Sequence, residues 1–138
     1  MKPAAFDYVR AETADEAVQQ LKALGPEARI LAGGQSLMAV LNMRLAQPSV
    51  LIDISRTEEL DFVRSEGSML AVGAAATQAS VEWRPSLARE VPLLAQAFPF
   101  ISHFQVRNRG TVCGSVAHAD PSAGIPLVLQ ALGGEVVL

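Results

Sequence analysis

The sequence predicts an α+β protein, with an α/β lobe over residues 1–55 and a differently patterned second part over residues 56–138. Up to residue 55, apolar runs of strand length alternate with stretches of helical apolar spacing, which is the order of a small α/β unit. After residue 55, a hairpin pattern is followed by helical spacing that prolines interrupt. The 138 residues suffice for one ordinary domain or two small lobes with a buried core.

The first part is expected to run strand, helix, strand, helix, strand. Thr13 and Glu16 form a capping-box pattern at the start of the first helix, and Gly25-Pro26 predicts its end. The expected strands cover residues 6–9, 29–32 and 50–54, and the expected helices cover residues 14–24 and 36–45.

The second part begins with a predicted hairpin, in which residues 61–64 pair with residues 69–73 across a turn at Gly67. From residue 77 to residue 104 the apolar spacing is helical, with breaks at prolines and one side facing a core. The prolines are Pro85, Pro92 and Pro99, and the expected core residues are Leu87, Val91, Leu94, Ala95 and Phe98.

The last third of the chain is predicted to hold a loop, a helix and the start of a strand. Residues 102–120 are rich in Gly, Ser, Asn, Arg and His and are therefore interpreted as a loop. Pro121-Ser122 predicts the start of a helix that ends at Gly133-Gly134. Residues 135–138, of which the last three are apolar, resemble the start of a strand, and an unpaired apolar strand predicts a chain that is incomplete at its C-terminus.

The segment Ile30–Met38 is the most informative one, because an apolar strand runs into Gly33-Gly34 and then into a polar helix start. Glycines at such a turn can take positive φ and let a ligand approach the backbone closely. Free N–H groups at a helix start attract phosphate, and the Ser36 hydroxyl can cap the helix or donate to a phosphate oxygen. A plain strand-to-helix connection that needs glycine for its bend is the alternative.

A second glycine-containing turn, residues 109–115, lies far along the chain from the first. Thr111, Gly114 and Ser115 supply hydroxyls and a flexible backbone, and Arg107 and Arg109 add positive charge. If the two turns meet in space, they can hold the diphosphate of a nucleotide-type cofactor between them. An exposed loop with two solvated arginines is the alternative.

Composition excludes several classes of function. A net charge of −3 without a basic cluster, and a single Trp and Tyr, argue against nucleic-acid binding. The single cysteine, Cys113, excludes an internal disulfide framework and a four-cysteine iron–sulfur site. No apolar run has the length of a signal peptide or a membrane span, so the sequence predicts a cytoplasmic location.

The sequence predicts neither a catalytic residue nor a metal site. It contains no Gly-x-Ser-x-Gly elbow, and no base is identified for Cys113. The spacing of His103, Cys113, His118 and Asp120 matches no zinc pattern. Cys113 is interpreted as a small buried filler, with a place beside a cofactor as the alternative.

Three segments together resemble one family: Ala32–Ser36, Gln47-Pro48 leading to Leu51–Ile54, and Gln105–Ser115. In this order they resemble the FAD-binding medium subunit of molybdenum hydroxylases, which include carbon monoxide dehydrogenase, xanthine dehydrogenase and bacterial nicotine-type dehydrogenases. The resemblance covers essentially the whole chain. It implies a two-lobed FAD-binding domain of the vanillyl-alcohol-oxidase/PCMH type, with FAD in the cleft between the lobes.

The resemblance also implies which residues contact FAD. Ala32–Ser36 matches the family's Ala-Gly-Gly-x-Ser motif, whose backbone amides hold the pyrophosphate, and Thr111–Ser115 falls on its Thr-x-Gly-Gly-Asp/Asn motif. Leu31 and Leu37 make apolar contacts in this comparison, and the segment 101–102 borders the adenine. The expected contact residues are Leu31, Ala32, Gly33, Gly34, Gln35, Ser36, Leu37, Ile101, Ser102, Thr111, Val112, Cys113, Gly114 and Ser115.

In the family, electrons pass from a molybdopterin large subunit to iron–sulfur clusters on a small subunit. The flavin subunit then takes the electrons from these clusters. The electrons then leave to NAD, a quinone or oxygen. No protein acid or base is central to this role, because the flavin carries the chemistry. The resemblance therefore implies an iron–sulfur and a molybdopterin subunit as partners, within a multi-subunit oxidoreductase.

The chain departs from the family's pattern at three positions and in length. Cys113 stands where the second motif usually has its first glycine, Ser115 replaces Asp or Asn, and Gly124 stands where an acidic residue often contacts the cofactor. Family members continue well beyond this length, so the second lobe is expected to be truncated. A different hypothesis is a cofactor-free structural or interaction fragment that self-associates through the terminal strand, residues 135–138.

Overall fold

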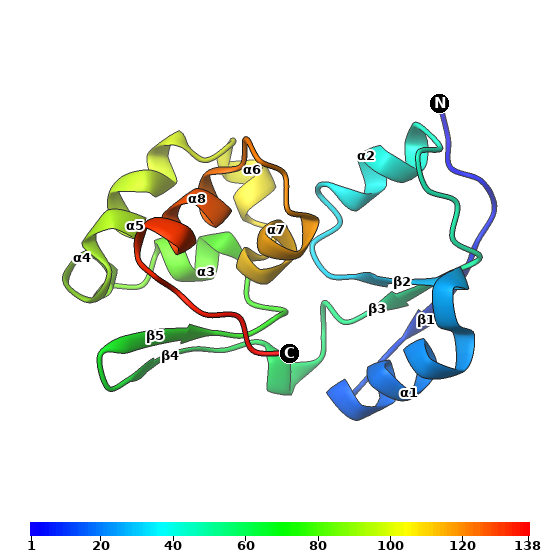
Figure 1. The fold of residues 1–138 in the computed structure, drawn as a ribbon, viewed down its shortest axis with the longest axis horizontal. Coiled ribbons are helices and arrows are strands. Elements are labelled where there is room, and N and C mark those ends of the chain that lie inside the picture. The colour runs from blue at the N-terminus through cyan, green and yellow to red at the C-terminus, as the bar shows by residue number, and fades with distance from the viewer.

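The computed structural model describes all 138 residues, which form two separate sheets and a group of short helices (Figure 1). The strands are β1 (Asp7–Arg10), β2 (Ala28–Leu31), β3 (Val50–Asp53), β4 (Val63–Glu66) and β5 (Met69–Val72). The α-helices are α1 (Ala14–Leu24), α2 (Leu37–Asn42), α3 (Gln78–Glu82), α4 (Leu87–Glu90), α5 (Pro92–Ala97), α6 (Phe104–Arg107), α7 (Val112–His118) and α8 (Gly124–Ala131). The 3-10 helices are η1 (Gly25–Glu27), η2 (Glu58–Leu60) and η3 (Phe98–Phe100). The chain is therefore a mixed helix and strand protein.

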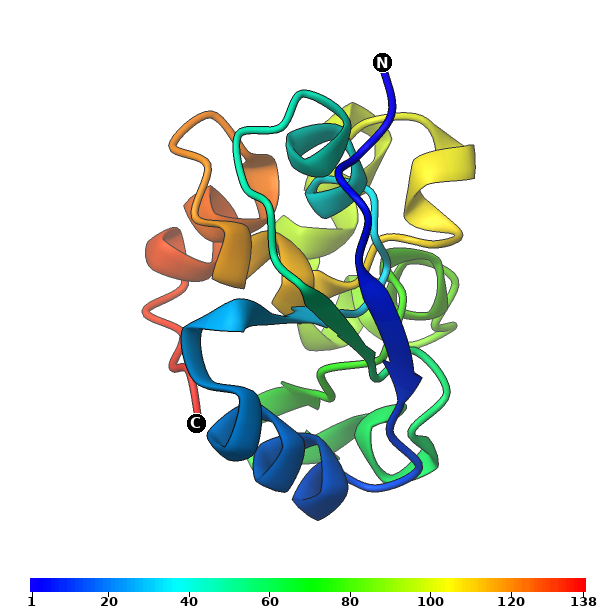
Figure 2. The same ribbon diagram turned by 90° about the vertical axis from the view of Figure 1, so that its right-hand side faces the viewer.

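The first three strands form a parallel sheet in the order β1-β3-β2, and strands and helices alternate over residues 1–55 as predicted. The central strand β3 is buried along its whole length and aligns Val50 with Asp7 of β1 and Ala28 of β2. Helices α1 and α2 connect parallel strands and lie on opposite sides of the sheet (Figures 1 and 2). All three carboxyl ends consequently point to the same edge, where the turn after β2 begins.

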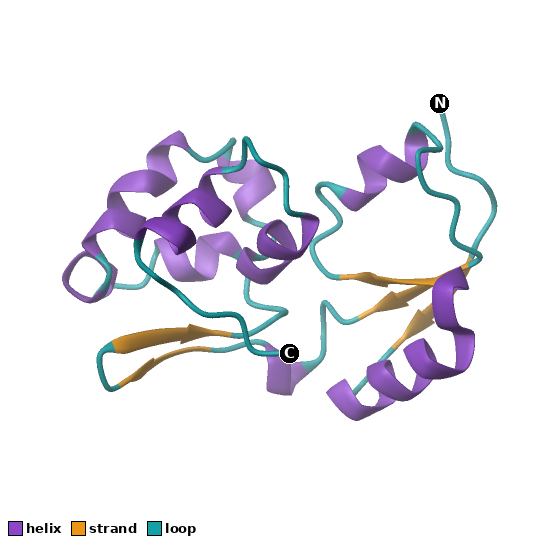
Figure 3. Cartoon of the chain, in the orientation of Figure 1, coloured by secondary structure: helices purple, strands orange, loops and turns teal.

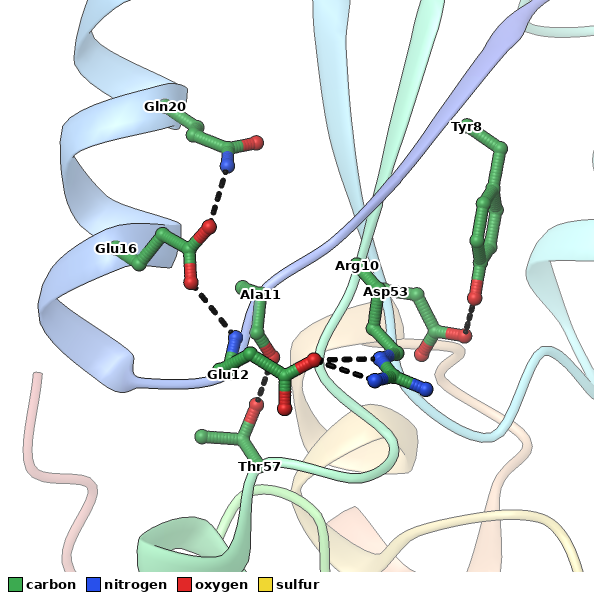
Figure 4. Close-up of polar contacts among 8 residues, drawn as sticks. All are labelled: Tyr8, Arg10, Ala11, Glu12, Glu16, Gln20, Asp53 and Thr57. Carbon is green, nitrogen blue, oxygen red and sulfur yellow. Dashed lines mark hydrogen bonds and ion pairs between the residues drawn. The ribbon is translucent and has the colours of Figure 1, made fainter.

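Helix α1 starts with the predicted capping box, in a slightly shifted form. The Thr13 hydroxyl accepts a hydrogen bond from the N–H of Glu16 at 3.1 Å. The Glu16 carboxylate accepts the N–H of Glu12 at 2.8 Å, one residue before the N-cap (Figure 4). Ala17 is buried on the sheet side, and the core between α1 and the sheet contains Ala11, Ala17, Ala28, Val50, Ile52 and Ile54.

The second part packs a hairpin against several helices. Strands β4 and β5 pair antiparallel across a turn in which Gly67 has a φ of 62°, a value that favours glycine. Pro92 lies in the first turn of α5, and Pro99 lies within η3, so the prolines bound short helices as predicted. A second core contains Val81, Leu87, Leu94, Phe98, Ile125 and Val128, with Val91 and Ala95 partly buried against it.

The prediction that residues 102–120 form a loop is wrong, because two helices lie within this range. Helix α6 covers Phe104–Arg107 and helix α7 covers Val112–His118. Thr111 is the N-cap of α7, and its hydroxyl accepts the N–H of Gly114 at 2.9 Å. Polar and small residues in this segment therefore serve helix capping and close packing, which composition alone does not distinguish from a loop.

The predicted strand at residues 135–138 is also wrong. These residues are exposed and irregular, and no strand pairs with them (Figure 3). The structure therefore does not support the hypothesis of association through a terminal strand. Helix α2 ends at Asn42 rather than at residue 45, and α8 starts at Gly124 because Asp120 and Ser122 form a turn before it.

Thr57 joins the chain that follows β3 to the end of β1. Its side chain is fully buried, and its hydroxyl donates to the carbonyl of Ala11 at 2.9 Å (Figure 4). The division into lobes at residues 55 and 56 stays a prediction. No helix in the structure combines the length and the apolar character that crossing a bilayer requires.

We expect Thr57→Val to lower the free energy of unfolding by about 1–3 kcal/mol, because the Ala11 carbonyl loses its buried donor. Urea unfolding followed by circular dichroism measures the change. Thr57→Ser keeps the hydroxyl and serves as the control, and equal losses in both variants would contradict the role of the hydrogen bond.

Candidate functional site

The two glycine-containing turns meet in the folded protein. A Cβ atom added at Gly33 would lie 2.1 Å from the carbonyl oxygen of Arg109 and 2.6 Å from the Cα of Gly110. A Cβ added at Gly110 would lie 3.4 Å from Cγ of Gln35. The backbone of the turn after β2 thus packs directly on the backbone of the turn before α7. Only glycine at position 33 permits this approach.

The turn after β2 presents a run of free amides. The N–H groups of the five successive residues Gly33 to Leu37 donate to no backbone or side-chain acceptor in the protein. The first helical hydrogen bond of α2 runs from the Met38 N–H to the Gly34 carbonyl at 3.1 Å, so the helix start accounts for the last three of these groups, since the first N–H groups of any helix lack intrahelical partners. The N–H groups of Gly33 and Gly34 precede the helix, and both glycines are partly buried. Such a run of donors is suited to an anion that accepts several hydrogen bonds.

The conformation of this turn differs from the prediction in two details. Gly34 has a φ of 71°, whereas Gly33 does not take positive φ and is required for close approach instead. Ser36 is at the N-cap of α2 but has helical φ and ψ and makes no capping hydrogen bond. Its hydroxyl makes no other hydrogen bond within the protein, so it can donate to a ligand.

The second predicted motif forms the start of α7. A Cβ at Gly114 would lie 2.5 Å from the Thr111 hydroxyl oxygen, so glycine makes room for the capping bond. The Cys113 thiol lies 3.4 Å from the carbonyl oxygen of Val72 in β5, and burial raises the pKa of this thiol. Cys113 therefore uses its side chain for packing against the hairpin, while its N–H has no acceptor in the protein.

A cavity of about 470 Å³ borders both turns at the carboxyl edge of the parallel sheet. Arg56 and Arg109 line it without forming an ion pair or side-chain hydrogen bond, whereas Arg10 is paired with Glu12. The cavity residues are Tyr8, Arg10, Ala32, Gly33, Asp53, Ser55, Arg56, Ala75, Thr77, Asn108, Arg109 and Thr111. The two unpaired guanidinium groups give the wall of the cavity a positive character.

The one carboxylate in this cavity is held by neighbouring donors. The Tyr8 hydroxyl donates to Oδ2 of Asp53 at 2.6 Å (Figure 4). The N–H of Ser55 donates to Oδ1 of Asp53 at 2.7 Å. Burial alone would raise the pKa of Asp53, but these hydrogen bonds outweigh it and lower the pKa below its ordinary value. The hydrogen bond to Asp53 is the main reason that the pKa of Tyr8 is raised.

The predicted adenine-side residues lie between η3 and α6. Ser102 has a φ of 55°, which is unusual for a residue other than glycine. Arg107 donates from Nη1 to the carbonyls of Ile101 and Ser102 at 2.9 and 3.0 Å. Ile101 packs against the start of α8, where a Cβ at Gly124 would lie 3.0 Å from Ile101 Cγ1. The side chain of an acidic residue at position 124 would overlap the Ile101 side chain unless Ile101 moved.

The structure therefore brings the two predicted glycine motifs together, and Arg107 binds the carbonyls of the predicted segment 101–102. Of the predicted contact residues, Ala32, Gly33 and Thr111 line the cavity. Sequence reasoning missed the contact of Gly33 with Arg109 and Gly110, and it also missed Tyr8, Asp53 and Arg56. No local pattern marks them, because the cavity combines residues from several distant segments. No group of His, Cys, Asp and Glu side chains gathers with the geometry of a metal site.

Residues 4–138 match the family model described as the FAD binding domain in molybdopterin dehydrogenase. The chain belongs to this family. FAD is the cofactor after which the family is named, and the resemblance that the three sequence segments carry is confirmed.

Relatives of this FAD-binding domain are oxidoreductase subunits. The chain is 43% identical over 136 residues to subunit alpha of the 6-hydroxypseudooxynicotine dehydrogenase complex of Paenarthrobacter nicotinovorans, with 99% of this chain and 46% of that protein covered. It is 41% identical over 138 residues to the carbon monoxide dehydrogenase medium chain of Hydrogenophaga pseudoflava, with 100% and 48% covered. The chain thus spans about half the length of the curated relatives it matches.

Solved structures agree with this assignment. Reconstituted CO dehydrogenase from Oligotropha carboxidovorans matches with a TM-score of 0.93 at 37% identity, covering 96% of this chain and 46% of that chain. Quinoline 2-oxidoreductase from Pseudomonas putida 86 matches with a TM-score of 0.91 at 40% identity and the same coverage. The mixed helix and strand fold of the FAD-binding domain is therefore shared with CO dehydrogenase and quinoline 2-oxidoreductase.

We expect Gly33→Ala to destabilise the FAD-binding domain by about 1–3 kcal/mol, since the new Cβ overlaps the backbone of Arg109 and Gly110. Thermal unfolding measures the effect. Gly124→Ala is the matched control, because its nearest neighbour is the side chain of Ile101, which can move. A stable Gly33→Ala variant would contradict the close contact of the turns.

Tyr8→Phe is expected to raise the pKa of Asp53, because the carboxylate loses its hydroxyl donor. A lowered pKa in the folded state stabilises the protein above the ordinary Asp pKa, and this contribution disappears as the pH falls through the lowered value. The variant should therefore lose stability mainly at neutral pH, with a weaker dependence on pH in the acidic range. Carbon-detected NMR titration of Asp53 and acid unfolding curves measure both effects, and an unchanged Asp53 titration would contradict the explanation.

Proposed function

We propose that this chain is the FAD-binding portion of the flavin subunit of a molybdenum hydroxylase. Residues 1–55 form the first lobe of a two-lobed domain of the vanillyl-alcohol-oxidase/PCMH type, and residues 56–138 begin the second lobe. FAD lies between the lobes, with its diphosphate between residues 32–36 and 111–115. Leu31 and Leu37 contact the cofactor through their apolar side chains, and residues 101–102 border the adenine.

The run of unpaired N–H groups from Gly33 to Leu37 carries this proposal. A diphosphate accepts many hydrogen bonds and approaches closely only where side chains are absent. The free Ser36 hydroxyl and the unpaired Cys113 N–H add donors on the two facing segments. Arg56 and Arg109 supply a positive potential near them. The neighbouring carboxylate of Asp53 is already bound by Tyr8 and Ser55.

FAD, when bound, accepts electrons and passes them on, and the residues of this chain hold and orient it. In this proposal the turn residues bind the cofactor and take no part in proton transfer. In the complete enzyme, a molybdopterin large subunit passes electrons to the iron–sulfur clusters of a small subunit. The small subunit then passes them to the flavin subunit. The relatives support a place in such a complex, since these proteins are themselves subunits of dehydrogenases.

We expect the purified protein to bind FAD and to show flavin absorption bands, either as the 138-residue chain or within a longer polypeptide that contains it. Ser36→Ala should weaken binding by about tenfold, because one hydrogen bond to a charged phosphate is lost. Isothermal titration calorimetry with FAD measures both results.

Ser68→Ala, in the turn of the β4–β5 hairpin, is the control for Ser36→Ala and should leave FAD affinity unchanged. Failure of both the chain and any longer polypeptide to bind FAD would overturn the proposed function. Equal FAD affinity of the wild type and Ser36→Ala would show only that Ser36 is not a contact.

A further inference from the structure

Arg107 connects the predicted adenine-side segment to the body of the second part. Its guanidinium forms a two-point ion pair with Glu82, with Nε to Oε2 at 2.7 Å and Nη2 to Oε1 at 3.0 Å. The remaining nitrogen, Nη1, donates to the carbonyls of Ile101 and Ser102 at 2.9 and 3.0 Å. The Arg107 and Glu82 side chains are only 10% and 14% exposed. The Arg107 side chain thus binds two consecutive backbone carbonyls and the Glu82 carboxylate at the same time.

Helix α3 is the common support for both predicted cofactor segments. At its start, the N–H of Gln78 donates to the Gly110 carbonyl at 2.8 Å, and Thr77 forms a bridge with Thr111. At its end, Glu82 holds Arg107. The helix is about one and a half turns long, so its two ends lie close together. The segment 101–102 and the start of α7 are therefore both bound to α3.

The backbone at Ser102 needs such support. A non-glycine residue with a φ of 55° is strained, and strain of this kind persists only where neighbouring groups enforce it. Arg107 supplies that enforcement, because its planar guanidinium binds the carboxylate and the carbonyls at the same time. A buried ion pair contributes little net stability compared with a well-packed apolar pair. The predicted role of this ion pair is therefore to set a conformation.

We propose that Arg107 is a positioning residue that, through Glu82, makes the site prefer the dinucleotide FAD over the mononucleotide FMN. This inference rests on the proposed function, in which residues 101–102 border the adenine. FMN lacks the adenylate half of FAD, so a displaced 101–102 segment weakens FAD binding and leaves FMN binding unchanged. Arg107 touches neither nucleotide directly in this scheme and acts through the Ile101 and Ser102 carbonyls.

The chain contains a closely matched control in Arg84. Its guanidinium also forms a two-point ion pair, with Glu90 at 2.6 and 2.9 Å, and donates from Nη1 to a backbone carbonyl, that of Val63 at 3.1 Å. The Arg84 and Glu90 side chains are each 24% exposed. This pair lies by the hairpin and supports no residue of the predicted site. Arg84→Met thus removes equivalent contacts without touching the segment 101–102.

The test titrates FAD and FMN into the wild type, Arg107→Met, Arg107→Lys and Arg84→Met, in the form of the protein that binds FAD. We expect Arg107→Met to weaken FAD by about tenfold and FMN by less than about twofold. Arg107→Lys keeps the charge but lacks the planar fork, so it should recover part of the loss. Arg84→Met should leave the ratio of the two affinities at its wild-type value.

Parallel losses of FAD and FMN affinity in Arg107→Met, or no loss of either, overturn the inference while leaving the proposed function intact. Failure of the wild type to bind FAD overturns both. A second measurement needs no ligand: hydrogen exchange of the Ile101 amide, which donates to the Phe98 carbonyl at 3.0 Å, should accelerate in Arg107→Met and Arg107→Lys but not in Arg84→Met. Unchanged exchange in the folded Arg107→Lys variant overturns the inference even if Arg107→Met does not fold.

Discussion

The packing of Gly33 against the peptide that joins Arg109 to Gly110 is the contact on which the site depends. It places the end of the parallel sheet against the beginning of α7, although the two segments are far apart in sequence. Because backbone meets backbone, the approach leaves no room for a side chain at position 33. The free amides of the turn after β2 and the start of α7 are thereby brought to one place.

The second part of the chain holds its half of this site with polar contacts rather than with a large core. Helix α3 binds the segment around Gly110 and Thr111 at one end and, through Glu82 and Arg107, the segment 101–102 at the other. The apolar residues of its neighbours α4, α5 and α8 form the core beneath these contacts. Packing therefore stabilises the platform, while hydrogen bonds and one buried ion pair determine where the loops lie.

Much of the fold could be predicted from local patterns. The three strands and two helices of residues 1–55, the hairpin at Gly67 and the proline-bounded helices all follow from spacing and capping signals. Residues 102–120 could not be predicted in this way, since their small and polar side chains also suit a loop. They become helical because Thr111 caps α7 and Gly114 makes room for that cap. Residues 135–138, of which the last three are apolar, pair with no strand, so apolar character alone did not produce a strand.

The sequence by itself determined the family, the order of elements in residues 1–55 and the two glycine motifs, because each is a local pattern carried by neighbouring residues. Only the tertiary structure decided that Gly33 meets Arg109 and Gly110, that Arg56 and Arg109 share a cavity, and that Arg107 supports residues 101–102. These contacts join segments whose separation along the chain leaves no periodic signal. The physical reason is that a ligand site depends on where folded backbones come together, whereas sequence patterns report how each segment folds on its own.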